Sequence, residues 1–221
     1  YSVRQENRKL KFKHVLFGKT YQYKDENSSL TVPVLFAFDK ISYNTVQGFT
    51  FNAPFRYTKK DTIGHYFDLS PDFTYAFSRK HLDYSLSSRY RYNGMKRAWI
   101  GFKGGSKAVD FNEESGINPM LNMMTSLYYK DNHLKLYDKN YVNIWHETDL
   151  ANGLNLHTEL EYANRKQLYN TNKFYFTGPK DNTYTPNIPA GVNPELIRDN
   201  KALTFIAQLE YTPRNRYTIK K

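Results

Sequence analysis

The 221-residue sequence contains no cysteine, which excludes disulfide bonds, thiolate nucleophiles and cysteine zinc sites. It also lacks any apolar run of about 18 residues, the length that a transmembrane helix requires. No charged and then apolar leader opens the chain, whose first residue is Tyr1 rather than methionine. We therefore expect a segment of a longer protein, with no membrane-spanning helix in it.

Aromatic residues are abundant instead, with 20 tyrosines and 15 phenylalanines. Tyrosine suits the boundary between lipid and water because it combines an apolar ring with a polar hydroxyl. The mean hydropathy of -0.77 is low for a membrane protein. A barrel strand presents only every second residue to lipid, so this low value does not exclude a membrane β-barrel.

Apolar and polar residues alternate almost without interruption from His65 to Tyr92. A period of two places each set on its own face of a strand. Residues 78–81 interrupt the alternation, which predicts a long hairpin with one aromatic face and one charged face. Strands of about 10 residues or more exceed the usual length and match what a tilted strand needs to cross a bilayer.

Alternation also predicts strands at residues 49–58, 97–104, 134–149, 154–163 and 203–212. The tip Ala151-Asn152-Gly153 suits a three-residue hairpin loop in which glycine takes a positive φ. Pro33 confines the apolar stretch 29–38 to an edge or a bend. Residues 8–18 are an ambiguous strand or connector, and residues 217–221 begin a further strand after a turn at 213–216.

Connections between these strands alternate in length. Four are short, at residues 59–64, 93–96, 151–153 and 213–216, and two are long, near residues 105–133 and 164–200. Outer-membrane barrels place short turns on the periplasmic side and long loops outside, so we expect the long loops to be extracellular.

The predicted fold class is all-β. We expect an antiparallel up-and-down transmembrane β-barrel, partial, of about 8 to 10 strands, with one short helix in a long loop. Residues 1–221 form a single barrel segment in this prediction, with a lead-in and first strands at 1–40 and regular strands at 41–221.

The two faces of the strands have different expected roles. Apolar side chains should contact lipid, through Phe67, Leu69, Phe73, Tyr75, Leu86, Tyr90, Leu156, Leu160, Phe205 and Leu209. Charged side chains should face the lumen, through Asp68, Asp72, Arg89, Arg91, Glu159 and Glu161.

Cross-strand pairs follow if the hairpin closes over Ser78 to His81. Asp68 would then lie opposite Arg91 and Ser70 opposite Arg89, with Asp72 diagonal to Arg89. Glu147 would lie near His157 on the other hairpin. Such charges either line a pore or form a salt-bridged ladder that fills a narrow interior, and we favour the ladder.

A helix start is present at Asn118-Pro119, followed by Met120, Met123, Met124 and Leu127 at helical spacing. This stripe either offers an adaptable binding surface or packs against the loop or the barrel rim, and we favour packing. The second long loop is rich in proline and either binds a ligand or covers the barrel mouth.

Catalytic and cofactor chemistry has little support in the sequence. His146 and Glu147 are neighbours on a strand and point to opposite faces, so they cannot share a metal ion. No helical zinc motif, nucleophile elbow or phosphate loop occurs. Glu159 and Glu161 have a spacing common on any polar strand face. We expect no enzyme, no cofactor and no metal.

The net charge of +11 is compatible with an acidic partner such as nucleic acid or anionic lipid. A surface that stacks single-stranded bases needs arginines and aromatic rings together. Here the aromatic residues fall on the face opposite the arginines, so we expect no nucleic-acid partner.

A family resemblance rests first on the segment Tyr43-Asn44-Thr45-Val46-Gln47-Gly48. Supporting stretches are Leu16-Phe17-Gly18, Ile117-Asn118-Pro119 with Leu127-Tyr128-Tyr129, and Tyr211-Thr212-Pro213 with Arg216-Tyr217. The chain resembles a bacterial outer-membrane β-barrel family of unknown function that carries an N-terminal carboxypeptidase-regulatory-like domain. Gln47 departs from the glutamate common in that family.

The resemblance implies a barrel distantly like those of outer-membrane assembly and two-partner secretion, located in the outer membrane of a Gram-negative bacterium. It implies partners among the lipid bilayer and other outer-membrane or periplasmic proteins, and it supplies no catalytic residues. The expected role is transport, assembly or surface scaffolding. The alternative is a soluble all-β binding module for glycans or acidic polymers; a hydrolase using Glu159 is the least favoured hypothesis.

Overall fold

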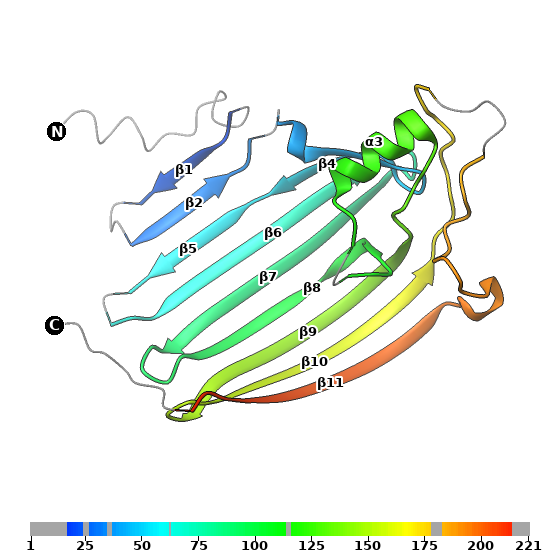
Figure 1. Ribbon diagram of the computed structural model, residues 1–221. Helices are drawn as coiled ribbons and strands as arrows, with labels where there is room; N and C mark the ends of the chain where they lie inside the picture. The colour runs from blue at the N-terminus through cyan, green and yellow to red at the C-terminus, as the bar shows by residue number, and fades with distance from the viewer. Residues whose placement is uncertain are drawn as a thin grey trace, which may run out of the picture.

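The computed structural model describes residues 17–23, 27–34, 37–61, 63–113, 116–177 and 183–213. Over these residues the chain forms one antiparallel sheet of 11 strands (Figure 1). The strands are β1 (Lys19–Gln22), β2 (Ser28–Val32), β3 (Ile41–Asn44), β4 (Gly48–Pro54), β5 (Arg56–Lys60), β6 (Tyr66–Ala76), β7 (His81–Asn93), β8 (Ala98–Asp110), β9 (Leu136–Ala151), β10 (Leu154–Gln167) and β11 (Asn200–Tyr211). The helices are η1 (Phe38–Lys40), α3 (Pro119–Tyr129) and η2 (Pro194–Leu196).

The sheet is open. Its strand order is β1-β2-β5-β6-β7-β8-β9-β10-β11, with β3 paired to β4 and β4 paired to β6. No pairing joins β1 to β11 within the described ranges. The all-β antiparallel prediction is therefore confirmed at this level, while closure into a barrel stays a prediction. None of the helices in the described part of the chain has the length and apolarity needed to cross a membrane.

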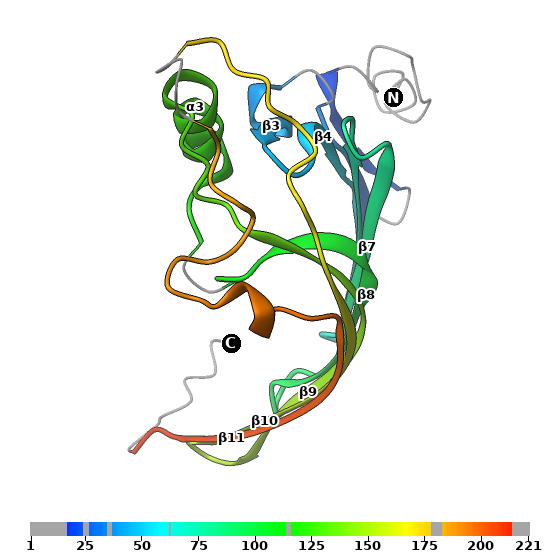
Figure 2. The same cartoon turned by 90° about the vertical axis from the view of Figure 1, so that its right-hand side faces the viewer.

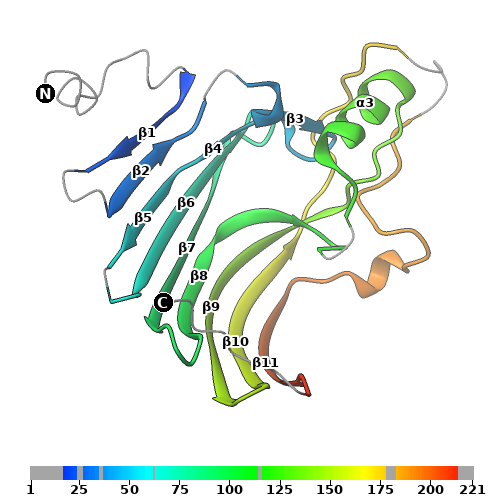
Figure 3. The ribbon, with the colours of Figure 1, turned by 60° about the vertical axis from the view of Figure 1, so that its left-hand side comes forward.

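Curvature gives the sheet a concave and a convex side. Figure 2 shows the strands nearly edge-on as a curved wall, with α3, β3 and η2 all on the concave side. The connections gather at two ends of the strands (Figure 3). The short connections β5–β6, β7–β8 and β9–β10 lie at what we call the turn end. The long connections β8–β9 and β10–β11, which include α3 and η2, lie at the opposite end, the loop end.

The β6–β7 hairpin has a different register from the predicted one. Ala76 lies opposite His81, so Asp68 faces Arg89 and Asp72 faces Ser85. The predicted pairs Asp68–Arg91 and Ser70–Arg89, and the diagonal contact of Asp72 with Arg89, are therefore wrong. Phe77 leaves the hairpin because its backbone N–H donates to Phe49 O of β4. The pairing differs by two residues, an even number, so every side chain keeps its predicted face.

Three strand boundaries also differ from the predictions. Residues 49–58 form two strands, β4 and β5, which both pair with β6 in one register. The ladder is interrupted at Phe55, whose N–H donates to Pro71 O, because proline has no N–H to donate in return. β8 continues beyond Gly104 to Asp110, paired to β9, so the first long loop starts at residue 111. At the β9–β10 tip, Ala151 faces Leu154 and Asp149 faces Asn155, which makes a two-residue turn with a bulge at Leu150.

Helix α3 begins at the predicted place, since the Asn118 side chain accepts from the N–H groups of Met120 and Leu121. The expected packing of its methionine stripe is wrong for Met120 and Met124, which are 54% and 44% exposed. Leu127, the last member of the stripe, is buried as expected, and Asn122 and Ser126 complete the buried face. The predicted segments 8–16 and 214–221 lie outside the described residues.

Candidate functional site on the concave face

The two faces of the sheet differ in chemistry over its whole width. Residues directly opposite each other share a face. The strand register places Asp68, Asp72, Arg89, Arg91, Glu159 and Glu161 on one face. The same register places on the other face Phe67, Leu69, Phe73, Tyr75, Leu86, Tyr90, Leu156, Leu160, Phe205 and Leu209.

The charged face is the concave one. Ile197 and Arg198, which follow η2, line one cavity together with Glu159 and Glu161. Figure 2 places η2 on the concave side of the wall. The apolar set therefore covers the convex side, where Phe205 and Leu209 are 68% and 65% exposed, whereas Asp68 on the concave side is 6% exposed.

Asp68 anchors a polar cluster on strands β5 and β6. Its carboxylate accepts from Arg56 Nε and Nη2 at 2.7 and 2.6 Å, from Tyr66 OH at 3.1 Å and from Ser70 Oγ at 3.0 Å. The partner of Asp68 is thus Arg56 rather than either arginine of β7. Both oxygens of the buried carboxylate accept hydrogen bonds. The cluster therefore links the side chains of β5 and β6 on this face.

Both tryptophans of the chain stand on this face. The Trp99 ring contacts the guanidinium groups of Arg89 and Arg91, each 5.5 Å from the ring centroid, and packs edge-on against Tyr66. Trp145 lies over Gly101, where an added Cβ would collide with the indole ring. Aromatic rings thus accompany the arginines on the concave side, so the expectation that the aromatic residues lie on the face opposite the arginines is wrong for Tyr66 and Trp99.

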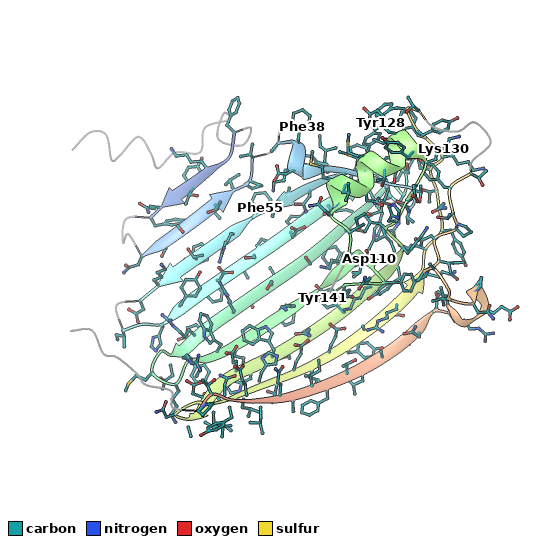
Figure 4. The ribbon with its side chains drawn as sticks, in the orientation of Figure 1. Phe38, Phe55, Asp110, Tyr128, Lys130 and Tyr141 are labelled. Carbon is teal, nitrogen blue, oxygen red and sulfur yellow. The ribbon has the colours of Figure 1, made fainter. Side chains whose placement is uncertain are left out.

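A cavity of about 770 Å³ occupies the concave face near the loop end. Tyr137, Lys139, Glu159, Glu161 and Arg165 give it both signs of charge, and Ile197 and Ile206 give it an apolar part. Lys139 Nζ lies 2.9 Å from Glu161, and Asn143 Nδ2 donates to Glu159 at 2.5 Å. Tyr141, labelled in Figure 4, stands beside the cavity with Lys139 over its ring.

Glu113 closes the loop side of this cavity. Tyr137 OH donates to its carboxylate at 2.5 Å, and Lys139 Nζ lies at 3.4 Å. Partial burial alone would raise the pKa of Glu113, but the Tyr137 hydrogen bond and the Lys139 charge outweigh it and lower the pKa. Glu113 therefore stays ionised near neutral pH and fixes the first long loop to β9.

The Tyr43–Gly48 segment forms the turn between β3 and β4, buried at the loop end. Asn44 Oδ1 accepts from the N–H groups of Val46 and Gln47, which sets the turn. Thr45 Oγ1 donates to Asn170 Oδ1 at 2.7 Å, and Tyr43 OH donates to Phe174 O at 2.6 Å. Burial raises the pKa of Tyr43 above its ordinary value, so its hydroxyl remains a donor. This turn thus holds the second long loop over the concave face.

The comparisons with known proteins agree with the motif. A family described as "family of unknown function (DUF5686) C-terminal domain" matches residues 12–221. The chain belongs to this family. No curated protein and no solved structure matches the chain significantly. The matched region includes the buried turn, both faces of the sheet and the cavity, so all of these are features of a DUF5686 C-terminal domain.

Several residues of the DUF5686 site were not predicted from the sequence. Asn122 and Asn132 are buried beneath α3, and Asn170 and Asn172 fix the second long loop to the β3–β4 turn. Asn170 and Asn172 carry no local pattern, because their partners Thr45 and Tyr43 are far away in the chain. Glu147 does face His157, as predicted. His146 faces Thr158 on the opposite side of β9 from Glu147, in agreement with the prediction that they cannot share an ion.

Proposed function

We propose that this DUF5686 C-terminal domain is a segment of a transmembrane β-barrel in a bacterial outer membrane, with its convex face in lipid and its concave face lining the lumen. One observation carries the proposal: the apolar side chains of the strands are on the convex face, where many are exposed, and the charged ones are on the concave face. A soluble sheet normally has the opposite arrangement, with its apolar face packed on a core.

The exposed apolar face is continuous from β7 to β11. Leu86, Gly104, Val142, Tyr162 and Leu203 form one row across it, linked by successive strand pairings. A contiguous apolar surface of this extent needs a cover, and in a barrel the cover is lipid. Strands β6 to β11 span 11 to 16 residues, which is sufficient for a tilted strand to cross the hydrocarbon layer.

The family resemblance supports the location in the outer membrane and a relation to barrels of assembly and two-partner secretion. It also supports an N-terminal carboxypeptidase-regulatory-like domain in the complete protein. Lipid is the principal partner in this proposal, and other outer-membrane or periplasmic proteins are candidate partners at the two open sheet edges.

Among transport, assembly and surface scaffolding, the concave cavity favours transport of a polar solute. Its wall combines paired charges with a small apolar patch, and the loop end covers it from outside. A salt-bridged wall of this kind tunes which solutes pass through a lumen. Single-channel conductance across planar bilayers tests this role, and a silent barrel would favour scaffolding instead.

Fractionation of the complete protein tests the membrane proposal directly. We expect the protein in the outer membrane, with an unheated band that migrates faster on a gel than the boiled band, as folded barrels do. A protein that remains soluble and migrates identically before and after boiling would contradict the proposal. That outcome would favour the soluble binding module and a glycan screen.

A further inference from the structure

From the geometry we infer a site for a divalent transition-metal ion, represented by Zn²⁺, at the loop end between β7 and β9. The ligands are His81 Nε2, the Oδ1 atom of Asp83 and a carboxylate oxygen of Asp138. These three atoms lie within 4.8 Å of one another. One imidazole nitrogen and two carboxylate oxygens are a donor set that Zn²⁺ accepts, with a fourth position left open.

Two of the ligand atoms are buried without a hydrogen-bond partner among the described residues. Asp83 has a side chain only 4% exposed, and its Oδ1 accepts no hydrogen bond. The Nε2 atom of His81 is also buried and unpartnered, and it lies 3.5 Å from Asp83 Oδ1. That separation is too long for a hydrogen bond, but two ligands of one tetrahedral Zn²⁺ lie about 3.3 to 3.6 Å apart. Buried polar atoms of this kind require a partner.

The other oxygen of Asp83 is already held in place. Asp83 Oδ2 accepts from Gln47 Nε2 at 2.8 Å and from Ala108 N at 3.2 Å. These two donors fix the carboxylate plane and direct Oδ1 toward His81 and Asp138, as the hydrogen-bond partners of metal ligands do in metal sites. Gln47 belongs to the buried β3–β4 turn, so the site is connected to the motif that carries the family resemblance.

Arg79 is the competing cation. Its Nη1 lies 3.8 Å from Asp83 Oδ1, and its Nη2 lies 3.4 Å from Asp138 Oδ1. Both contacts are long, and Nη1 has no hydrogen-bond partner in the part of the chain that the structure describes. Arg79 sits in the 77–80 turn, from which its long side chain can leave the cluster when a metal ion enters.

The position of the metal site between β7 and β9 gives the ion a structural role. The pairing of β7 with β8 reaches only Tyr84 and Ser106, after which the two strands separate. His81 and Asp83 lie on β7 beyond that point, and Asp138 lies on β9. A metal ion held by all three would join β7 to β9 at the point where β7 has separated from β8, and would fasten the loop end over the concave face.

Calorimetric titration with ZnCl₂ tests the site. The sample is the full chain, folded in detergent and treated with EDTA before the titration. We expect one ion per chain and a higher unfolding temperature with Zn²⁺ than after EDTA. H81A and D138N should each weaken binding by at least about tenfold. R79Q should tighten it, because it removes the competing charge. Co²⁺ in place of Zn²⁺ should give a visible absorption band that H81A abolishes.

The matched control is H133A. His133 Nε2 lies 3.2 Å from Asp131, an exposed pair with no further carboxylate in the cluster, so its loss should leave Zn²⁺ affinity unchanged. Equal Zn²⁺ affinity in the wild type and H81A would overturn the proposal. Water would then be the bridge between His81 Nε2 and Asp83 Oδ1. If R79Q does not fold, H81A and D138N decide alone, with gel migration as the check on folding.

Discussion

Gly48 has the left-handed φ of +69° that closes the buried β3–β4 turn. A Cβ at this position would collide with the Ser78 hydroxyl, which accepts from Asn172 at 2.7 Å. We expect G48A to add backbone strain of about 1 to 2 kcal/mol and steric crowding of about 1 to 3 kcal/mol. The free energy of unfolding is measured by urea titration, in which the intensity of the folded band on a gel reports the folded fraction.

Gly64 provides the matched control, since its φ is +93° and a Cβ added there would have no atom of the described residues within 4 Å. G64A should therefore cost the backbone strain alone. Equal losses of stability in G48A and G64A would show that the contact with Ser78 is unimportant and that the buried turn tolerates a side chain.

Protonation of the Glu113 carboxylate should weaken the attachment of the first long loop to β9. Its pKa in the folded chain is below the ordinary value of 4.5, because Tyr137 and Lys139 stabilise the carboxylate. Its contribution to stability is thus complete above about pH 4.5 and is lost as pH falls through the folded pKa. E113Q should flatten the fall in unfolding temperature in that acidic range, and an unchanged slope would contradict this link.

At the scale of one strand, neighbouring positions of β7 should differ sharply in their tolerance of charge. Leu86 is on the convex face and Ser87 on the concave face. If β7 crosses a bilayer, L86R places a charge in lipid at a cost of about 2 to 4 kcal/mol. S87R faces Lys103 across the strands and should cost less than about 1 kcal/mol. Urea titrations of folding into lipid vesicles measure both, and equal costs would count against lipid on the convex side.

Helix α3 depends on its polar face rather than on its methionines. Asn122 is completely buried, and its Oδ1 accepts from the N–H groups of His133 and Leu134 at 2.8 and 3.0 Å. N122A should cost about 1 to 3 kcal/mol for each group left unpaired and should open the first long loop to proteases. M124A removes an exposed side chain and should change neither property; comparable cleavage of both variants would refute this role of the polar face.

Figure 4 shows the C-terminal end of α3 with Tyr128 and Lys130 labelled. Lys130 Nζ lies 3.7 Å from the centroid of the Tyr175 ring, and Tyr128 packs against Phe176. The second long loop therefore contacts this end of the helix, in addition to the β3–β4 turn. The Asn118-Pro119 pair predicted where α3 begins, but the helical spacing after it could not reveal which face is covered, because the covering residues come from another loop.

Over the whole molecule, alternation predicted that the apolar and charged sets of the strands take opposite faces, because the period of two is a property of the local backbone. It did not place Tyr66 and Trp99 beside the arginines. It could not fix the β6–β7 register, since an even shift preserves both faces and the decisive bond joins Phe77 to Phe49. The buried polar network was equally inaccessible: Thr45 and Asn170 are 125 residues apart, and no local pattern predicts such a pair.

The orientation of the whole domain follows from its two ends and can be measured with single cysteines, since the chain has none of its own. Met95 is 89% exposed at the turn end, and Met124 is 44% exposed at the loop end. If the long loops are extracellular, M124C in intact cells should react with a maleimide that cannot cross the outer membrane, and M95C should react only after permeabilisation. The reverse pattern would invert the domain in the membrane, and equal labelling of both thiols in intact cells would place neither end behind a lipid barrier.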